Sequence, residues 1–272
     1  MESMKKHSKT VLITGASSGM GRVTAHYLAQ QGFRVYAGSR TPEKLQDIQG
    51  VIAIKLDITN PKNINEVIGS IDKIDVLINN AGYGLVSTVE DVTEGEMMAL
   101  FNINVFGLLR VTQAVIPKMR AQNQGVIINI SSFLGKIGLP LFTLYNASKY
   151  AVEGITDSLR YELRDFNIRV HSIMPGFFDT NFARDNLKIN EKTFCDDSAY
   201  WDLVSILAPT IVDQINEGNR SEEIAQLILK IIENPNSPAR QTAGDKAKKF
   251  IPMKQELSDE DFERRVREYY HL

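Results

Sequence analysis

Residues 10–21 read TVLITGASSGMG, and this stretch decides the fold that the sequence predicts. An apolar, β-branched run ends at Ile13 and leads into a loop with glycines at positions 15, 19 and 21, and a helix-like segment then continues through Leu28. Glycines allow a tight turn and let backbone amides approach a pyrophosphate at the positive end of a helix. Three glycines would also fit a plain turn, but their place between a strand and a helix predicts a dinucleotide-binding turn.

Short apolar runs alternate with longer helix-like stretches from Thr10 onward, which is typical of a parallel sheet covered by helices. Thr41-Pro42 and Asn60-Pro61 each place a capping residue before a proline, so two helices are expected to begin there. We predict an α/β fold, a single Rossmann-type doubly wound parallel sheet with helices on both faces, over residues 1–272. The six expected strands are Val11–Ile13, Phe33–Ala37, Val51–Leu56, Val76–Ile78, Val126–Ile130 and Ile168–Ile173.

The second half of the chain contains one long helical pattern, from about Leu144 to Phe166. Apolar residues recur there every four positions, which predicts a stripe facing an apolar surface: Ala147, Ala151, Ile155, Leu159 and Leu163. The pattern is less regular from Phe177 to Asn219 and becomes helical again at Ser221–Ile232. Residues of about 177–220 are therefore expected to form a small C-terminal excursion from the sheet, on the substrate side.

Composition excludes several classes of function. The net charge of −2 and the scattered Lys and Arg residues argue against nucleic-acid binding. The single cysteine, Cys195, permits no intramolecular disulfide and no four-thiolate zinc site, and no metal site is expected. The polar N-terminus lacks the apolar stretch of a signal peptide, and no apolar run of about 20 residues is apparent, so a cytoplasmic protein without membrane association is expected.

The glycine spacing Gly-x-x-x-Gly-x-Gly resembles that of the short-chain dehydrogenase/reductase family. Further motifs of that family follow in order across residues 10–180: Asn79-Asn80-Ala81-Gly82, Asn104 in Asn-Val-Phe-Gly, Tyr145-x-x-x-Lys149, and Pro175-Gly176 with Thr180 beyond it. The segments Asn79–Gly84 and Ser237–Arg240 look like the hydroxysteroid-dehydrogenase-like branch. That likeness does not establish a steroid substrate, because one fold serves many substrates.

The end of the second strand indicates the cofactor. NAD enzymes usually place a carboxylate there, whereas NADP enzymes provide a cation for the 2′-phosphate. Ser39 and Arg40 therefore favour NADP(H), although Arg40 could also be a plain surface residue, and Ser18 replaces the basic residue that the family sometimes has in its glycine loop. Asp57 resembles the family's acidic residue near the adenine, and a turn-forming role fits it equally well.

By the glycine-loop argument and the family resemblance together, the expected cofactor site has 19 members. They are Gly15, Ser17, Ser18, Gly19, Met20, Gly21, Ser39, Arg40, Asp57, Ile58, Asn80, Ala81, Gly82, Tyr145, Lys149, Pro175, Gly176, Phe178 and Thr180.

Tyr145 and Lys149 lie four residues apart and so share one face of a helix. A free phenol has a pKa of about 10, and a neighbouring ammonium should move the pKa of Tyr145 toward neutrality. Tyr145 is expected to be the proton donor and acceptor. Family resemblance implies that Lys149 also holds the nicotinamide ribose and that Asn104 holds a water of the proton relay. An asparagine bonded to helix backbone is the plainer interpretation of Asn104, and it is compatible with the same role.

Two serines follow the fifth strand, and the family's spacing to its tyrosine chooses between them. Ser132 lies thirteen residues before Tyr145 and is expected to orient the substrate oxygen, with Ser131 at the strand end or on the cofactor side. His171 is expected to be a structural strand residue, and Cys195 an inert thiol.

The sequence thus predicts an NADP(H)-dependent oxidoreductase acting on a carbonyl or alcohol group. Aromatic residues in the irregular region predict a lipophilic substrate, unless they only pack that region onto the core: Phe177, Phe178, Phe182, Phe194, Tyr200 and Trp201. The stripe on the long helix, together with the family's habits, predicts a homodimer or homotetramer. A non-catalytic NADP(H)-binding redox sensor and a sugar-nucleotide epimerase or dehydratase are the alternatives.

Overall fold

The computed structural model describes residues 9–179 and 186–272. Its centre is a parallel sheet of seven strands in the order β11-β7-β6-β4-β1-β2-β3. The strands are β1 (Thr10–Thr14), β2 (Arg34–Ser39), β3 (Val51–Lys55), β4 (Val76–Asn79), β6 (Gly125–Ile130), β7 (Ile168–Pro175) and β11 (Arg240–Ala243). Strands β2 and β3 follow β1 on one side, and β4, β6, β7 and β11 are added on its other side, so the strand order reverses between β1 and β4. This is the doubly wound Rossmann-type sheet that the sequence predicts.

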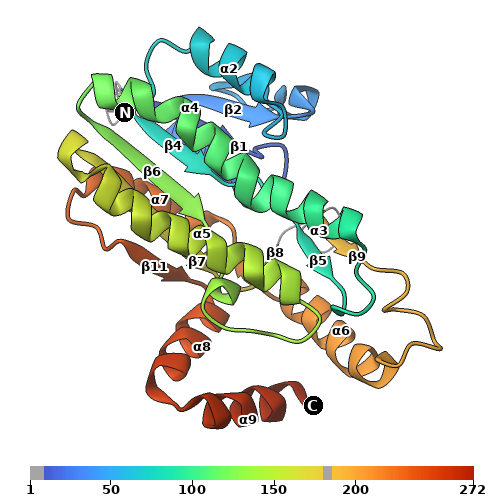
Figure 1. The fold of residues 1–272 in the computed structure, drawn as a ribbon. Coiled ribbons are helices and arrows are strands. Elements are labelled where there is room, and N and C mark those ends of the chain that lie inside the picture. Colours follow the sequence, from blue (N-terminus) through green and yellow to red (C-terminus); the bar gives the residue numbers. More distant parts are fainter. Residues whose placement is uncertain (1–8, 180–185) are drawn as a thin grey trace.

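Helices cover both faces of the sheet (Figure 1). Helices α1 (Gly19–Gln30) and α7 (Glu222–Glu233) pack on the face that receives Val11 and Ile13 of β1. The opposite face receives Leu12 and is covered by α2 (Pro61–Ser70), α4 (Leu108–Ala121) and α5 (Thr143–Glu162). Successive side chains of a strand point to opposite faces, which explains why the central strands are apolar throughout.

The six expected strands are all present, and their bounds differ from the prediction by at most two residues. The seventh strand, β11, was missed. Its sequence, Arg-Gln-Thr-Ala, has no apolar run because it lies at the edge of the sheet and three of its four residues are only partly buried. Pairing with the neighbouring β7, from Arg240 opposite Ser172 to Ala243 opposite Pro175, makes it a strand.

Of the two expected helix starts, one is confirmed. Asn60 caps α2, and its side chain accepts a hydrogen bond from the Asn63 amide. The Thr41 prediction was wrong, because Pro42–Leu45 forms only a short 3₁₀ turn, η1. There the Thr41 amide donates to Ser39 Oγ, and the segment has too few buried side chains, Leu45 and Ile48, to support a helix of several turns.

The long helix is present as α5, followed by the short turn η4 (Arg164–Phe166), but the predicted stripe is not its buried face. Ala147 is exposed, Ala151 and Ile155 are half-buried, and burial is complete only toward the end of the stripe. The face that packs on the sheet is largely polar: Asn146, Ser148, Lys149, Val152, Glu153, Thr156 and Leu159. A search for apolar periodicity could not find this face, because its polar residues form the site described below.

The region after β7 is more regular than expected. It contains β8 (Phe178–Asp179), β9 (Leu187–Ile189), α6 (Trp201–Asn216) and β10 (Asn219–Arg220), and β9 pairs with β5 (Gly84–Val86). The sequence did not predict α6, because Pro209 lies inside it and a proline usually ends a helix. Helices α8 (Asp245–Glu256) and α9 (Asp259–Tyr270) complete the chain, and their side chains join those of α6 in one apolar cluster.

One continuous helical stretch, Glu94–Ala121, is long and apolar enough to cross a membrane by length and composition alone. It comprises α3 (Glu94–Phe101), the π-helical turn η2 (Asn102–Gly107) and α4. This corrects the expectation that the chain has no apolar run of such a length. Buried core helices pass the same test, and 44% of its most apolar window is buried inside the molecule.

Candidate functional site

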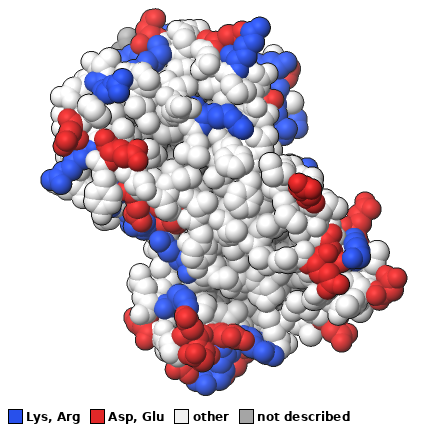
Figure 2. All heavy atoms as spheres, in the orientation of Figure 1, with Lys and Arg blue, Asp and Glu red and all other residues white. Residues whose placement is uncertain are grey.

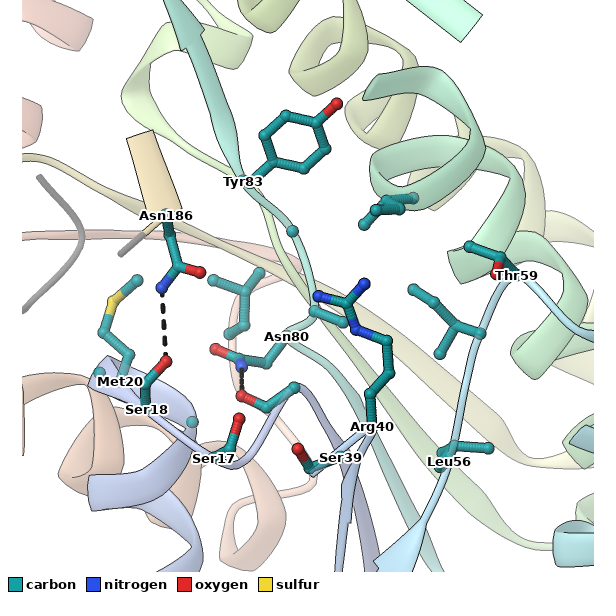
Figure 3. A pocket seen from close by; sticks show the side chains of 18 of the residues that line it. Ser17, Ser18, Met20, Ser39, Arg40, Leu56, Thr59, Asn80, Tyr83 and Asn186 are labelled. Carbon is teal, nitrogen blue, oxygen red and sulfur yellow. Dashed lines mark hydrogen bonds between the residues drawn. The ribbon is translucent and has the colours of Figure 1, made fainter. Parts of the chain in front are cut away.

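The loop after β1 is held against the loop after β4. Gly15 has φ of +66°, and a Cβ atom there would lie only 2.7 Å from Ala81 Cα, so no other residue fits without moving backbone. Asn80 Nδ2 donates to the carbonyl oxygens of Thr14 and Gly15, each at 3.0 Å. Asn80 therefore holds the glycine loop through its side chain (Figure 3).

A cleft of about 260 Å³ opens at the carboxyl ends of the strands, on both sides of this contact. This is the place where doubly wound folds bind dinucleotides. Of the expected cofactor residues, fifteen line it: Gly15, Ser17, Ser18, Gly19, Met20, Gly21, Ser39, Arg40, Asp57, Ile58, Asn80, Ala81, Gly82, Tyr145 and Lys149. Pro175, Gly176 and Phe178 line a smaller adjoining pocket instead, and Thr180 lies outside the described residues.

Ser131 lines the cleft as well, on the cofactor side where the sequence places it. Seven residues of the cleft were not found from the sequence: Leu56, Thr59, Tyr83, Ile103, Ile130, Asn186 and Lys188. Most of them lie within two residues of an expected site residue in the sequence, and this proximity could have indicated them. Asn186 and Lys188 belong to no motif and reach the cleft because β9 pairs with β5. Asn186 Nδ2 donates to Ser18 Oγ at 3.3 Å and so joins this segment to the glycine loop (Figure 3).

Ser39, Arg40 and Asp57 form one end of the cleft. Ser39 is buried, and the Arg40 side chain extends from the end of β2 into the cleft (Figure 3). Asp57 Oδ1 accepts hydrogen bonds from the Thr59 amide (2.9 Å) and hydroxyl (2.7 Å), as the turn-forming interpretation predicts, while the residue also lines the cleft. Burial opposes ionisation of Asp57, but these bonds and the Arg40 guanidinium hold its pKa below the usual value.

Tyr145 lies where the cleft meets the smaller pocket, of about 60 Å³, and Met20, Ser131 and Tyr145 line both. Burial raises the pKa of Tyr145 to about 12, while a hydrogen bond with Ser132 partly opposes that rise. Ser132 Oγ also accepts from the Leu134 amide at the start of the turn η3 (Phe133–Gly135). Ser132 is thus oriented toward Tyr145 on the side of the smaller pocket.

Lys149 is buried one turn along α5. Its Nζ donates to the Ile130 carbonyl at 2.9 Å and lies 5.6 Å from the centre of the Tyr145 ring. Burial lowers the pKa of Lys149 to about 8, against the opposing charge of Glu153. The expectation that Lys149 lowers the pKa of Tyr145 is wrong for this arrangement, because desolvation of the phenol is the larger effect and the ammonium is bonded to the strand.

Asn104 lies in η2, a π-helical turn of the kind often found at functional sites. Its Oδ1 accepts from the Tyr83 amide (3.0 Å), and its Nδ2 donates to the Tyr83 carbonyl (2.9 Å) and to Ser148 Oγ (3.1 Å). The side chain therefore bonds to backbone, as the plainer interpretation has it, but the backbone is that of the loop after β4. Asn104 fixes Gly82–Tyr83 to α5.

A buried polar chain lies beneath this site, between the sheet and the helices. Asn79 Nδ2 donates to Thr112 Oγ1 and to Asn129 Oδ1, and Asn129 Nδ2 donates to Thr156 Oγ1, each at 2.9 Å. These bonds link α4, β4, β6 and α5, and buried amides paired in this way hold one arrangement strongly.

His171 and Cys195, for which the sequence predicts no catalytic role, lie outside the cleft. His171 Nδ1 lies 2.9 Å from the Pro238 carbonyl, and its Nε2 lies 3.1 Å from Arg169 Nη1. Burial lowers the pKa of His171. Cys195 is exposed, and within residues 9–179 and 186–272 no group of three or more His, Cys, Asp and Glu could hold a metal ion.

Comparison with known proteins agrees with this geometry. The sequence profile described as "short chain dehydrogenase" matches residues 9–190. A 3-ketodihydrosphingosine reductase of Bacteroides thetaiotaomicron is 37% identical over 89% of this chain and 93% of its own. A short-chain dehydrogenase structure from Streptomyces avermitilis superposes with a TM-score of 0.82 at 31% identity and covers 97% of both chains. The chain belongs to the short-chain dehydrogenase/reductase family and is a hydride-transfer oxidoreductase.

Structures with the same fold hold either form of the nicotinamide cofactor. A serine dehydrogenase complexed with NADP+ is 26% identical, with a TM-score of 0.75, over 87% of this chain and 94% of its own. An NAD+-bound xylitol dehydrogenase is 25% identical, with a TM-score of 0.76, over 88% and 99%. Neighbours of this fold thus bind a nicotinamide cofactor, in either the NAD or the NADP form.

Substitution of Gly15 by Ala should weaken NADPH binding by tenfold or more. The new Cβ would strain the left-handed backbone and meet the Ala81 backbone, moving the loop amides away from the phosphates. Gly154→Ala is the matched control, because a Cβ there meets nothing within 4 Å. Titration of NADPH fluorescence measures both affinities, and equal values for the two variants would contradict the role of the Gly15–Ala81 contact.

Proposed function

We propose that this protein is an NADP(H)-dependent oxidoreductase that interconverts a carbonyl and an alcohol group of a lipophilic substrate, with Tyr145 as the general acid and base. One observation carries the proposal: Tyr145 lies at the junction of the dinucleotide cleft and an apolar pocket, beside Ser132 and Lys149. A group in that place can reach a substrate oxygen while the cofactor occupies the cleft.

The residues divide the chemistry among them. Bound NADP(H) supplies or accepts the hydride. In reduction, Ser132 Oγ orients the substrate oxygen and Tyr145 Oη gives it a proton, so that the carbonyl gains one hydride and one proton and becomes an alcohol. A pKa of about 12 keeps Tyr145 protonated at neutral pH, which suits proton donation. The Lys149 ammonium, 5.6 Å from the centre of the Tyr145 ring, offsets part of the cost of the phenolate left behind, although burial remains the larger effect on Tyr145.

The smaller pocket supports a lipophilic substrate. Among the described residues, its lining beyond Ser132 and Tyr145 contains no charged side chain: Met20, Ser131, Phe133, Leu134, Phe142, Pro175, Gly176, Phe177, Phe178, Leu187 and Ile215. Of the aromatic residues noted in the sequence, Phe177 and Phe178 line this pocket, Tyr200 bonds to Glu90 elsewhere, and Phe182 lies outside the described residues. This lining fits a lid formed by residues of about 177–220. It also fits a lipophilic substrate with a 3-keto group, the group that the name of the Bacteroides relative contains.

The test of the proposal is the replacement of Tyr145 by Phe. NADPH oxidation is followed with a panel of aldehydes, diketones, quinones and steroid ketones, and kcat should fall by a factor of about 100 to 10,000 while NADPH affinity is kept. Tyr150→Phe is the control, because Tyr150 is an exposed tyrosine on the same helix. Turnover by Tyr145→Phe at the wild-type rate would refute the assignment. NADPH binding by the wild type with turnover of no compound would favour a redox sensor.

The choice of NADP(H) is supported by Ser39 and Arg40. Position 39 is a serine, so it carries no negative charge that would repel a 2′-phosphate. The Arg40 guanidinium extends into the cleft and offers a positive charge for that phosphate (Figure 3). The Arg40→Ala variant should bind NADPH about tenfold more weakly with little change for NADH, because only NADPH carries the 2′-phosphate.

The Ser39→Asp variant should bind NADH better than NADPH, because its carboxylate would repel the 2′-phosphate. Arg34→Ala, at the far end of β2, is the control, and a tighter affinity of the wild type for NADH would contradict the assignment.

We infer that the protein is a homodimer or homotetramer that pairs through α4 and α5. Apolar side chains are exposed here, namely Phe106, Leu109, Tyr150 and Tyr161, and η2 packs beside α5. Figure 2 shows an area without charged residues in the middle of this face, over α5. Such a patch commonly marks an interface.

Replacement of Leu109 by Glu should shift the protein toward the monomer in analytical ultracentrifugation, because it places a charge in the apolar patch. Ile52→Glu, an exposed apolar residue on β3 at the opposite edge of the sheet, should not change the mass. A monomeric wild-type protein would contradict this inference.

A further inference from the structure

The buried face of α5 carries a second ionisable side chain next to Lys149. Glu153 follows one helical turn later, so the two side chains lie on the same face of the helix. Lys149 is 6% exposed and Glu153 3%. A carboxylate buried to this degree is rare unless it is paired, because its removal from water is costly.

Glu153 is held from the far side by a strand that is distant in sequence. Its Oε2 accepts from Arg240 Nε of β11 at 2.6 Å and lies 3.5 Å from Lys136 Nζ at the end of η3. Arg240 also pairs with Asp157, one turn further along α5. The other oxygen of Glu153, Oε1, has no hydrogen-bond partner within residues 9–179 and 186–272, so part of its negative charge is not compensated by a direct bond.

The Lys149 ammonium is buried, and a nearby negative charge is what would keep it protonated there. The hydrogen bond that its ammonium makes to the Ile130 carbonyl of β6 has a neutral acceptor. The neutral amide of Asn104, from η2, is close by, because a Cβ atom at Gly82 would lie near both Asn104 Oδ1 and Lys149 Nζ. From α5 it faces Tyr145 and Glu153, and Lys136 and Arg240 lie beyond Glu153. The Glu153 charge opposes the effect of burial on the pKa of Lys149.

The turn that carries Ser132 closes over this pair. A Cβ atom at Gly135 would lie 2.9 Å from the Lys149 carbonyl oxygen and 3.2 Å from Glu153 Cγ, so the turn sits directly on α5 between the two residues. Water is thereby kept from the carboxylate, and a charge in a dry place acts more strongly on its neighbour.

We propose that Glu153 is a positioning residue for Lys149: its buried carboxylate, held by Arg240 of β11, keeps the Lys149 ammonium charged and in place beside Tyr145. The importance of this for turnover rests on the proposed function of Tyr145. The electrostatic link itself does not, and it can be measured without cofactor or substrate.

The direct test is a titration of the cofactor-free, full-length protein labelled with ¹³C at the lysine Cε, followed by NMR, with the Lys149 signal assigned from Lys149→Met. The wild-type midpoint is expected at about 8. In Glu153→Gln it should fall by about one pH unit, because the opposing charge is lost. Glu153→Asp, which keeps the charge, should restore most of the difference. Asp157→Asn is the matched control, since it removes the other partner of Arg240 and should leave the midpoint unchanged.

A second variant covers the case in which Glu153→Gln does not fold because Arg240 loses its partner. The double variant Glu153→Gln, Arg240→Gln removes both charges, which proteins tolerate better than a single unpaired one. Its Lys149 midpoint should also fall, by less. A midpoint unchanged in whichever of these two variants folds would overturn the proposal.

Turnover then separates this inference from the proposed function. If Tyr145 and Lys149 act as proposed, the loss of activity toward alkaline pH should begin about one pH unit lower in Glu153→Gln than in Asp157→Asn. A shifted Lys149 midpoint with no turnover in any variant would retain the positioning role and reject the proposed chemistry. An unshifted midpoint beside normal Tyr145-dependent turnover would reject the positioning role alone.

Discussion

The rest of the site depends on the contact between Gly15 and Ala81. Strands β1 and β4 lie side by side at the point where the strand order reverses, so the connections that follow them diverge and a cleft opens between. Because Gly15 has no side chain, the two loops touch there, and Asn80 bonds to both Thr14 and Gly15. This contact sets the direction in which α1 begins, and with it the place where a pyrophosphate meets the helix.

The second constraint is the polar interface between α5 and the sheet. Helices normally pack on a sheet through apolar side chains, yet α5 buries Lys149, Glu153 and Thr156. These groups are stabilised by partners from other elements, such as Ile130, Arg240 and Asn129. The arrangement gives up some hydrophobic stabilisation and gains a fixed position for the residues that face the cleft.

Much of the fold followed from local patterns. Strand runs such as Val11–Ile13 are apolar because both faces of the sheet are covered. A continuous apolar run of this kind can be recognised from the sequence alone. Two patterns misled, one because of a distant strand and one because of a nearby side chain. Edge strand β11 exists through its pairing with β7, and the Thr41 segment is only a turn, because Ser39 takes the Thr41 amide and few apolar residues follow.

The candidate site divides in the same way. The sequence by itself determined the glycine loop, because spacing within one strand–turn–helix unit fixes which groups meet at the edge of the sheet. The Ser132, Tyr145 and Lys149 set was predicted from the resemblance to the family's motifs, and Ser39 and Arg40 from the charge that a 2′-phosphate would meet at the end of the second strand. Only the tertiary structure decided that burial raises the pKa of Tyr145, that Asn104 is bonded to Tyr83, and that Lys149 shares a dry interface with Glu153 and, through it, with Arg240, 87 residues further along the chain. The physical reason is that solvation and charge depend on neighbours in space, which a linear spacing does not record.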